Sequence, residues 1–443
     1  MNGTGEARGA GRRRALTALF VTVLLDLLGF GMILPLLPFY AQTFGASEIG
    51  IGVLYASFSG MQLLFAPVLG LLSDRLGRRP VLLCSIAGSL AAYLLFAAAP
   101  GFGRWGFAAL LAGRLGAGAT AASFAVAPAY IADVLPSAER ARGMGLLGAA
   151  FGLGFVLGPA IGGVLGLAGH VAVALGAAAL AAVNLVLAAA WLPEPLTAER
   201  RAMARGSSWL DPGALRRLGR DRALGGLMVL FFLTTFCFSL MESTLALFVQ
   251  DRFGFGQRET SWLFVLVGVV LVAVQGGAVG PLSRRLGERR LFLAGVALLA
   301  VSLLALPEPA RLPLFAGAVC MLAAGAAVAN PSSMALVSRV AGERTQGEGM
   351  GLSHSFGSLA RLLGPLAGTW LFANAGPAWP FRAGGALMAA AVVFGAVVMR
   401  WIGTPAEPVP SGHAEGAAAT ANAPSESRFS PRPEPTGGTT EPR

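Results

Sequence analysis

The sequence predicts an all-α integral membrane protein whose twelve transmembrane helices form two pseudo-symmetric six-helix bundles. Composition is the first reason: of 443 residues, 55% are hydrophobic and 12% are charged, whereas a soluble domain carries about 25% charged residues. The second reason is a series of long apolar stretches. The third is a repeat that relates the second half of the chain to the first.

The apolar stretches are continuous, which predicts helices. A helix needs roughly 20 apolar residues to cross the hydrocarbon core, and it satisfies its own backbone hydrogen bonds in lipid. Strands of a membrane barrel would instead show about ten residues of alternating polarity. The expected spans are residues 15–40, 49–72, 80–99, 105–131, 143–167, 171–192, 223–249, 261–282, 291–306, 312–337, 349–373 and 378–401.

The basic residues indicate the topology. All 33 are arginine and the formal net charge is +11; cytoplasmic loops retain such residues. They gather before the first span and after each even-numbered one, so both termini are expected in the cytoplasm of a multi-pass protein of the plasma or inner membrane. In a soluble protein this charge would suggest nucleic acid; here the topology explains it, and no nucleic-acid partner is expected. The opposite loops hold only Arg104, Arg252, Arg258, Arg311 and Arg382.

One long polar loop divides the spans into six and six. It covers residues 193–222 and is interrupted by Pro195, Gly206 and Pro212. The segment after residue 402 is rich in Pro, Ser, Gly, Glu and Thr, a composition that predicts disorder. The expected parts are a cytoplasmic tail 1–14, a bundle 15–192, the central cytoplasmic loop 193–222, a bundle 223–402 and a cytoplasmic tail 403–443.

The two halves repeat one another at three places. Duplicated six-helix halves are typical of transporters that rock two bundles about a central site. The matching segments are 70–79 with 280–289, 143–146 with 349–352, and 158–159 with 364–365.

Four groups of residues resemble motifs of the major facilitator superfamily, over about residues 15–402. The first span, with Asp26, Gly29, Gly31, Pro35 and Pro38, is similar to the opening of the tetracycline-efflux and related drug/proton antiporters. Arg114 and Gly118 resemble the motif of the fourth span. The loop after the second span resembles the signature loop in Gly70, Asp74, Arg75, Gly77, Arg78 and Arg79. The fifth span resembles the antiporter motif in Gly154, Gly158, Pro159, Gly162 and Gly163.

The resemblance implies a conformational latch at the signature loop. It places Asp74 at the positive N-terminus of the eleventh span, near Gly349. Arg75 and Arg78 are then expected to pair with Asp133, and the cluster would hold the halves in the outward-facing state until they rock. A plain positive-inside loop leaves the glycines and the acid unexplained. The second copy has Arg284 in place of the acid, so the latch is expected mainly on one side.

The antiporter motif has two open interpretations. Gly154, Gly158 and Gly162 recur every four residues, so one face of the fifth span is nearly bare backbone. Such a face allows close helix packing, and the same contact is part of the role that the resemblance implies. Pro159 should bend the helix because it removes a backbone donor.

Four charged residues fall within the spans, where a charge costs at least about 2.5–3.5 kcal/mol. Asp26, Arg114, Glu242 and Arg361 are expected to face one polar central cavity. Asp26 or Glu242 would load and release the coupled proton, since burial disfavours a charged carboxylate. The alternative is a permanent hydrogen bond or ion pair, such as Asp26 with Arg114. The arginines, which stay protonated, would tune the acids or bind an anionic group.

Other classes of protein are not supported. Cys84, Cys237 and Cys320 lie far apart, so neither disulfides nor a metal site are expected. The chain has no phosphate-binding loop for ATP, and it lacks the carboxylate or histidine clusters of a membrane-embedded enzyme. No cofactor is expected beyond the proton as coupling ion.

The predicted function is therefore secondary active transport, namely the export of small amphipathic compounds in exchange for protons. The alternative is a proton-coupled importer of a sugar or another small metabolite. The tetracycline pumps carry an acid in the third span where this chain has Ala92, so tetracycline itself is not the expected substrate. The protein is expected to act on a small molecule, in the bilayer, as a monomer.

Overall fold

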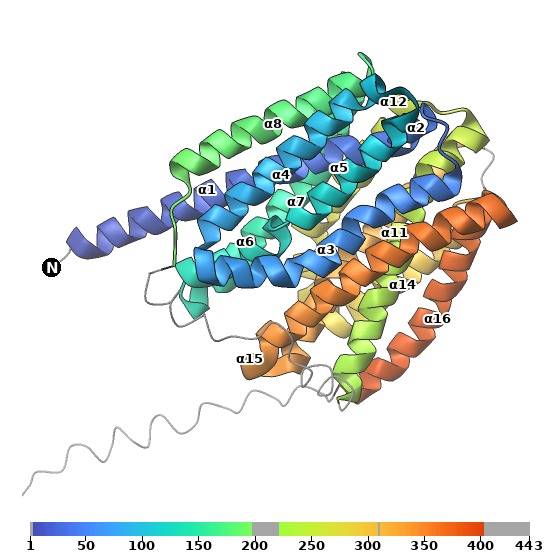
Figure 1. Cartoon of the computed structure of the whole chain (residues 1–443). Helices are drawn as coiled ribbons and strands as arrows, with labels where there is room; N and C mark the ends of the chain where they lie inside the picture. Colours follow the sequence, from blue (N-terminus) through green and yellow to red (C-terminus); the bar gives the residue numbers. More distant parts are fainter. Residues whose placement is uncertain (1–2, 197–220, 309–310, 403–443) are drawn as a thin grey trace, which may run out of the picture. The chain divides into compact units, whose positions relative to one another are not determined.

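In a computed structural model of the chain, residues 3–196, 221–308 and 311–402 are described, and within these ranges every regular element is a helix (Figure 1). The predicted all-helical fold class is confirmed. Most of the central loop and the whole C-terminal tail lie outside the described residues. The first half contains α1 (Gly3–Ile33), η1 (Leu34–Leu36), α2 (Leu37–Gln42), α3 (Glu48–Leu76), α4 (Arg78–Ala98), η2 (Ala99–Trp105), α5 (Gly106–Thr120), α6 (Ser123–Val134), α7 (Ser137–Gly166) and α8 (His170–Trp191).

The second half begins at α11. Its helices are α11 (Arg222–Phe253), α12 (Gln257–Ala273), the π-helix η4 (Val274–Ala278), α13 (Val279–Leu286), α14 (Glu288–Ala305), α15 (Leu312–Ala375) and α16 (Trp379–Trp401). Each of the twelve expected spans falls on a helix. Among the described residues, 9 helical segments are long and apolar enough to cross a membrane, and one of these, Arg78–Val134, contains two expected spans.

The helix α15 carries two expected spans and folds back on itself. A straight helix of its 64 residues would be about 96 Å long at ~1.5 Å per residue. Near its start, however, Phe315 stacks on Phe248 of α11, with 6.0 Å between the ring centroids. Near its end, Gly368 lies against Leu240 of the same helix. The two parts of α15 therefore run alongside α11 in opposite directions.

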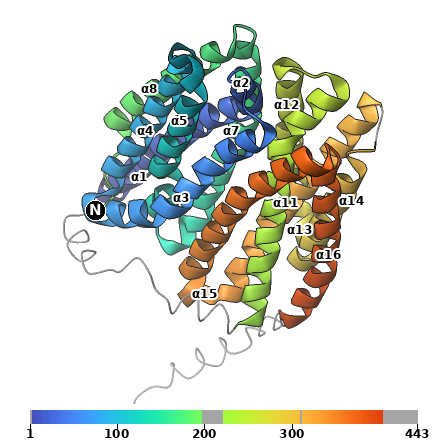
Figure 2. The ribbon, with the colours of Figure 1, turned by 45° about the vertical axis from the view of Figure 1, so that its right-hand side comes forward.

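The two halves meet through two pairs of helices: α3 lies beside α15, and α7 lies beside α12 (Figure 2). At one end of the two halves, α3 and α13 end and α7 and α11 begin; we call this the arginine-rich end. Close contacts between the halves gather at the opposite end, where Gln42 and Gln250 exchange amide hydrogen bonds of 3.1 and 3.3 Å. Three further pairs in contact there are Gly52 with Thr369, Gly163 with Ser261, and Gly166 with Gln257.

At the arginine-rich end the same helices leave space. Gly145 and Gly148 of α7 have no atom within 4 Å of an added Cβ, and the same holds for Gly276 and Gly280 on the other side. The conformation is therefore closed between the halves at the opposite end and open at the arginine-rich end.

Several expected helices are interrupted. Proline residues 35 and 38 convert the end of α1 into a 3-10 turn. The fourth span, expected to be continuous, breaks between α5 and α6, where Ala121 has ψ of 66°. The Ala122 amide donates to Ser85 Oγ at 3.0 Å instead of continuing the helix. Broken helices at membrane depth are tolerated where they line a cavity, so this break points to the site.

The repeat is visible in the backbone. Gly77 separates α3 from α4 with φ of 111°, and Gly287 separates α13 from α14 with φ of 76°. Both positions lie in the repeated loop, and both need a conformation that glycine adopts without strain. The sequence repeat is therefore also a repeat of turn geometry.

Candidate functional site

Asp26 of α1 lines a cavity inside the first half, together with Phe30, Phe58, Tyr93 and Arg114. Ser123 donates a hydrogen bond of 2.7 Å to its Oδ2, and Ser89 donates one of 3.3 Å to its Oδ1. The described contacts include no ion pair between Asp26 and Arg114. The carboxylate is therefore held by hydroxyl groups rather than by a permanent counter-ion.

Arg114 is a buried cation in the same cavity, only 5% exposed. Its Nε donates to the Leu54 carbonyl at 3.3 Å. The guanidinium carbon lies 4.7 Å from the centre of the Phe58 ring and 5.7 Å from that of Phe30, so the aromatic faces stabilise the charge. No described carboxylate lies within ion-pair distance, which leaves Arg114 able to bind an anionic group.

Glu242 of α11 lines a second cavity, within the second half. The walls are apolar and include Phe238, Met241, Leu245 and Phe264. Its carboxylate makes no hydrogen bond or ion pair with a described residue, although Arg361 and Arg114 are near enough to interact with it electrostatically. A carboxylate without a direct partner in an apolar cavity is suited to exchange a proton or a cation.

Arg361 of α15 completes the set, and its Nη2 donates to Ser358 at 3.3 Å. A single cavity shared by all four residues stays a prediction. Of the cavities described, one within the first half is lined by Asp26 and Arg114, and another within the second half is lined by Glu242.

The sequence analysis missed Ser89 and Ser123. Ser123 is the first residue of α6, so the break after α5 is what brings its hydroxyl to Asp26. A weak signal was available, because Ser85 and Ser89 lie four residues apart on one face of α4. Which acid they would solvate depends on packing between helices.

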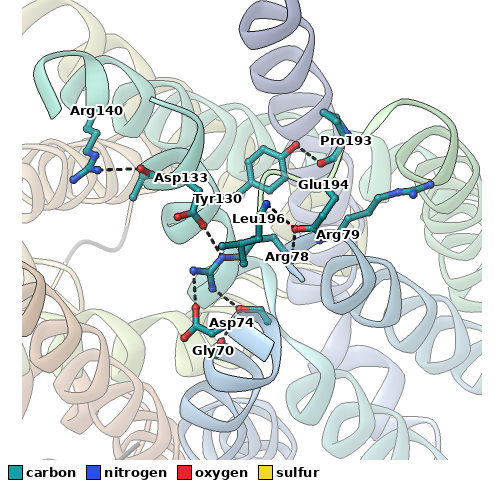
Figure 3. A network of polar contacts seen from close by, with 12 residues as sticks. Gly70, Asp74, Arg78, Arg79, Tyr130, Asp133, Arg140, Pro193, Glu194 and Leu196 are labelled. Atoms are coloured by element: carbon teal, nitrogen blue, oxygen red, sulfur yellow. Dashed lines mark hydrogen bonds and ion pairs between the residues drawn. The ribbon is translucent and has the colours of Figure 1, made fainter. Parts of the chain in front are cut away.

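The signature loop forms a cluster of polar contacts at the arginine-rich end (Figure 3). Arg78 bridges Asp74 at 2.6 Å and Asp133 at 2.9 Å, and its Nη1 also donates to Ser73 Oγ at 2.6 Å. The predicted pair of Arg78 with Asp133 is therefore present. We call Asp74, Arg78 and Asp133 the latch cluster. All three belong to the first half, so the contacts described join α3, α4 and α6 rather than the two halves.

One expected latch contact is not seen, and a second is not tested. Arg75 is exposed and makes no ion pair with a described residue. The reason is geometric, since consecutive helical residues point about 100° apart and Asp74 already faces Arg78. The contact expected between Asp74 and a helix N-terminus near Gly349 stays a prediction, although α15 is assigned as helix through that position. The side chains around Gly349 lie outside the described residues.

Glu194 is the second omission of the sequence analysis. Its Oε1 and Oε2 accept hydrogen bonds from the backbone amides of Arg78 and Arg79, each at 3.0 Å. Its Oε1 also accepts one from the Leu196 amide at 3.1 Å. The available signal was an acid between two prolines, directly after the sixth span. Glu194 falls at the start of the central polar loop expected at residues 193–222, for which no site residue was expected.

The second half carries a charge-reversed counterpart of the Arg78 and Asp133 pair. Glu288 is the first residue of α14, as Arg78 is of α4, and it pairs with Arg339 Nε at 3.0 Å. The exposures differ: the Arg78 and Asp133 side chains are 10% and 17% exposed, whereas Arg339 is 65% exposed. The more buried pair lies in the first half, where the latch was expected.

The glycines of the fifth span pack α7 directly against α1. A Cβ at Gly154 would lie 2.6 Å from Leu27 Cβ, and one at Gly158 would lie 2.8 Å from Gly31 Cα. A Cβ at Gly162 would lie 2.6 Å from the Met32 carbonyl. Gly163 instead faces Ser261 of the second half. The stripe therefore brings two backbones into contact, and its end borders the interface between the halves.

The family model described as Major Facilitator Superfamily matches residues 19–279 and 257–434. The chain is 35% identical over 369 residues to the class C tetracycline resistance protein of Escherichia coli, covering 82% of this chain and 91% of that protein. It is 32% identical over 420 residues to human major facilitator superfamily domain-containing protein 10, covering 82% of this chain and 88% of the relative.

Solved structures give the same fold. The crystal structure of the human organic anion transporter MFSD10 superposes with a TM-score of 0.67 at 29% identity, covering 87% of this chain and 99% of that one. The nucleoside transporter NupG superposes with a TM-score of 0.69 at 14% identity, covering 88% of this chain and 100% of that one. At 14% identity, the similarity to NupG supports the fold alone.

Proposed function

Because this chain belongs to the Major Facilitator Superfamily and is a multi-pass membrane transporter, we propose that it exports small amphipathic compounds in exchange for protons. The observation that carries the proposal is the pair of intramembrane carboxylates. Asp26 and Glu242 line cavities in different halves, and neither forms an ion pair with a described residue. A carboxylate in that situation is free to bind either a proton or a cationic group.

The exchange follows from competition. A proton and the cationic or polar end of a substrate cannot occupy one carboxylate together, so each lowers the affinity for the other. If the carboxylate faces one side of the membrane at a time, inward movement of protons drives the substrate outward. The apolar walls around Glu242, which include Phe238 and Phe264, suit the apolar part of an amphipathic compound.

The arginine-rich end is assigned to the cytoplasm, because cytoplasmic loops retain arginine. The protein would then lie in the plasma or inner membrane with both termini inside, and the described conformation would be open inward and closed outward. The working unit is proposed to be a monomer. The proton is the only coupling ion proposed, with no further cofactor.

Several relatives are named tetracycline resistance proteins, but one cavity residue argues for a different compound here. Ala92 lines the Asp26 cavity at the position where, by the resemblance stated above, the tetracycline pumps carry an acid. A methyl group there removes a ligand for a metal chelate. The substrate is proposed to be an amphipathic compound bound without a metal.

The test is flux in proteoliposomes. Purified protein would be reconstituted into liposomes with a pH gradient of either sign. Lipophilic cations or neutral amphipathic drugs would be added on one side of the membrane, and a pH-sensitive dye on the other side would report the movement of protons that accompanies drug transport. We expect substrate to move against the proton flow for at least one compound, and to stop when the gradient is collapsed. Substrate and protons moving in the same direction would contradict the proposal.

Arg114 favours a second candidate function, transport of an organic anion together with a proton. The guanidinium is buried and has no described carboxylate partner, and the MFSD10 relative is described as an organic anion transporter. An anion bound at Arg114 would repel the negative charge on Asp26, so anion and proton would favour each other's binding. That linkage gives cotransport rather than exchange, and the dye signal would then have the opposite sign.

A further inference from the structure

The short helix α13 lies at the arginine-rich end, where the eighth expected span finishes (Figure 2). It contains no buried residue, and neither does the π-helix η4 that precedes it. Leu282 and Leu286 are 38% and 45% exposed, and they lie four residues apart on one face of the helix. Arg284 and Arg285, between them in the chain, are exposed as well. The helix therefore presents apolar and basic side chains that no described part of the chain buries.

The arginines here have no acid as a direct partner. Arg284, Arg285 and Arg290 are exposed, and none of them forms an ion pair or a side-chain hydrogen bond with a described residue. The acid nearest to them in the sequence, Glu288, is already paired with Arg339 at 3.0 Å. We use the name α13 surface for Leu282, Arg284, Arg285, Leu286 and Arg290.

The first copy of the repeated loop places its charges differently. Asp74 stands at the position that matches Arg284, and it pairs with Arg78 at 2.6 Å. The last turn of α3 thus carries one acid and one base, Asp74 and Arg75, whereas the last turn of α13 carries two bases. The positive charge of α13 is therefore left for a group outside the described chain to balance.

A second anionic group of the first copy also has no described counterpart. The carboxylate of Glu194 fills the space over Gly77, where an added Cβ would collide with it. At Gly287, the matching glycine of the second copy, an added Cβ would meet no described atom within 4 Å. In the described residues, the second copy thus lacks the carboxylate that lies beside the arginines of the first.

An anionic phospholipid has the chemistry that fits the α13 surface. Phosphate oxygens accept the parallel N–H groups of a guanidinium, and basic residues at a membrane boundary attract anionic headgroups. Acyl chains cover the apolar side of such a helix. A soluble polyanion would satisfy the arginines but would leave Leu282 and Leu286 uncovered. The presence of both kinds of side chain on one helix of 8 residues therefore favours a lipid.

We propose that the α13 surface binds one anionic phospholipid: Arg284, Arg285 and Arg290 hold its phosphate, and Leu282 and Leu286 lie against its acyl chains. The site depends neither on the transported compound nor on the exchange of protons, so its test stands apart from that of the proposed function. The rival explanation is general attraction, in which every exposed arginine at this end contributes equally to the binding of charged lipids.

Native mass spectrometry of the full chain tests the proposal. The protein would be released from detergent micelles that contain either phosphatidylglycerol, which is anionic, or phosphatidylcholine, which has the same phosphate but no net charge. The spectra count the lipids that stay bound and give the affinity for each. We expect the first phosphatidylglycerol to bind about tenfold more tightly than phosphatidylcholine. Equal affinities for the two lipids would overturn the proposal.

The combined variant Arg284→Gln, Arg285→Gln and Arg290→Gln should weaken the binding of the first phosphatidylglycerol by about tenfold or more, because three charges beside the phosphate are lost. The matched control changes to glutamine three exposed arginines of the first half at the same end, Arg13, Arg14 and Arg75. The control removes the same charge, yet it should change the affinity by less than about twofold. Equal losses in the two variants would establish general attraction and refute the site.

Two further measurements distinguish a lipid from a soluble phosphate. Glycerophosphoglycerol has the same headgroup without acyl chains, and binding as tight as that of phosphatidylglycerol would show a site for a free phosphate ester instead. Leu286→Ser should weaken phosphatidylglycerol binding by about threefold, because less apolar surface meets the acyl chain. Leu76→Ser, at the matching and 53% exposed position of the first copy, should leave it unchanged. Equal effects of the two serine variants would contradict the proposal.

A single substitution keeps the test valid if the combined variant does not fold. Arg284→Asp gives the second copy the residue that the first copy has at this position, and it reverses one charge of the α13 surface. We expect it to weaken phosphatidylglycerol binding by about tenfold. An unchanged affinity in this folded variant would refute the site.

Discussion

Asp26 and Glu242 differ in how the fold surrounds their carboxylates. Both oxygens of Asp26 accept hydroxyl hydrogen bonds, from Ser123 and Ser89. Glu242 has no described hydrogen-bond partner and lies among apolar side chains. Hydrogen bonds to the charged form favour it, whereas desolvation favours the neutral form. The two acids are therefore suited to different steps of one cycle.

Neutral substitutions should separate these roles. Asp26→Asn keeps the shape of the side chain but fixes it without charge, so substrate should still bind and exchange while gradient-driven export falls by about tenfold or more. Glu242→Gln tests the rival carrier in the same way. The measurement is counterflow against pH-driven flux in the same proteoliposomes. If Asp26→Asn pumps normally and Glu242→Gln does not, the proton carrier lies in the second half.

Side-chain contacts were predicted where the family resemblance indicated both partners, and were missed where only the packing of helices brings the partners together. The pairing of Arg78 with Asp133 followed from the signature loop and is present. The hydroxyl contacts of Asp26 depend on a break between α5 and α6 at Ala121, a position that the preceding Gly116 and Gly118 do not locate by themselves. Glu194 lies 116 positions along the chain from Arg78, and no local pattern indicates such a distant contact.

At the scale of helices, spans were predictable because each must bury about 20 apolar residues in lipid. The ends of the spans and the interruptions within them were less predictable. The first helix begins at Gly3, well before the expected start at residue 15. The eighth span contains the π-helix η4, and the two spans of α15 are joined without a loop. These features depend on contacts with neighbouring helices, whereas hydropathy indicates only which stretches are apolar enough to lie in lipid.

The glycine stripe of α7 makes a prediction about stability. Gly158→Ala places a methyl group 2.8 Å from Gly31 Cα, a backbone atom that cannot move aside without shifting α1. We expect it to lower the free energy of unfolding by about 1–3 kcal/mol, seen as a lower melting temperature in detergent. Gly145→Ala is the control on the same helix, because its added Cβ meets open space. Equal melting temperatures for the two variants would show that the stripe does not pack α7 against α1.

The two related ion pairs should differ in strength. Arg78 and Asp133 are 10% and 17% exposed, whereas Arg339 is 65% exposed. Exposed pairs contribute about 0–1 kcal/mol, while removing one member of a buried pair costs about 3–5 kcal/mol. We therefore expect Asp133→Asn to reduce thermal stability clearly more than Glu288→Gln. The check is differential scanning fluorimetry of both variants, and a larger loss for Glu288→Gln would contradict it.

At the scale of the molecule, transport requires the halves to separate at one end while they close at the other. In the described conformation the opposite end is closed, by Gln42 on one half and Gln250 on the other. Gln42 is the last residue of α2 and Gln250 lies in the last turn of α11, so the pair joins the ends of the first expected spans of the two halves. Each amide donates to and accepts from its partner. Neutral hydrogen bonds contribute about 0.5–1.5 kcal/mol each, a strength that holds a gate closed yet lets it open in every cycle.

Breaking this pair should therefore open the opposite end without harming the fold. Gln42→Ala and Gln250→Ala each remove both hydrogen bonds. Each should therefore raise the rate at which Ser261→Cys, at a buried position of the opposite end, reacts with a membrane-impermeant maleimide by about threefold to tenfold. The double variant should raise it no further, because the second substitution has no bond left to break. Asn374→Ala is the control, since Asn374 is exposed near the end of α15 and its amide donates only to the Trp370 carbonyl within its own helix. Additive effects of the two glutamine variants, or no change in either, would mean that other contacts, such as Gly166 with Gln257, hold this end closed.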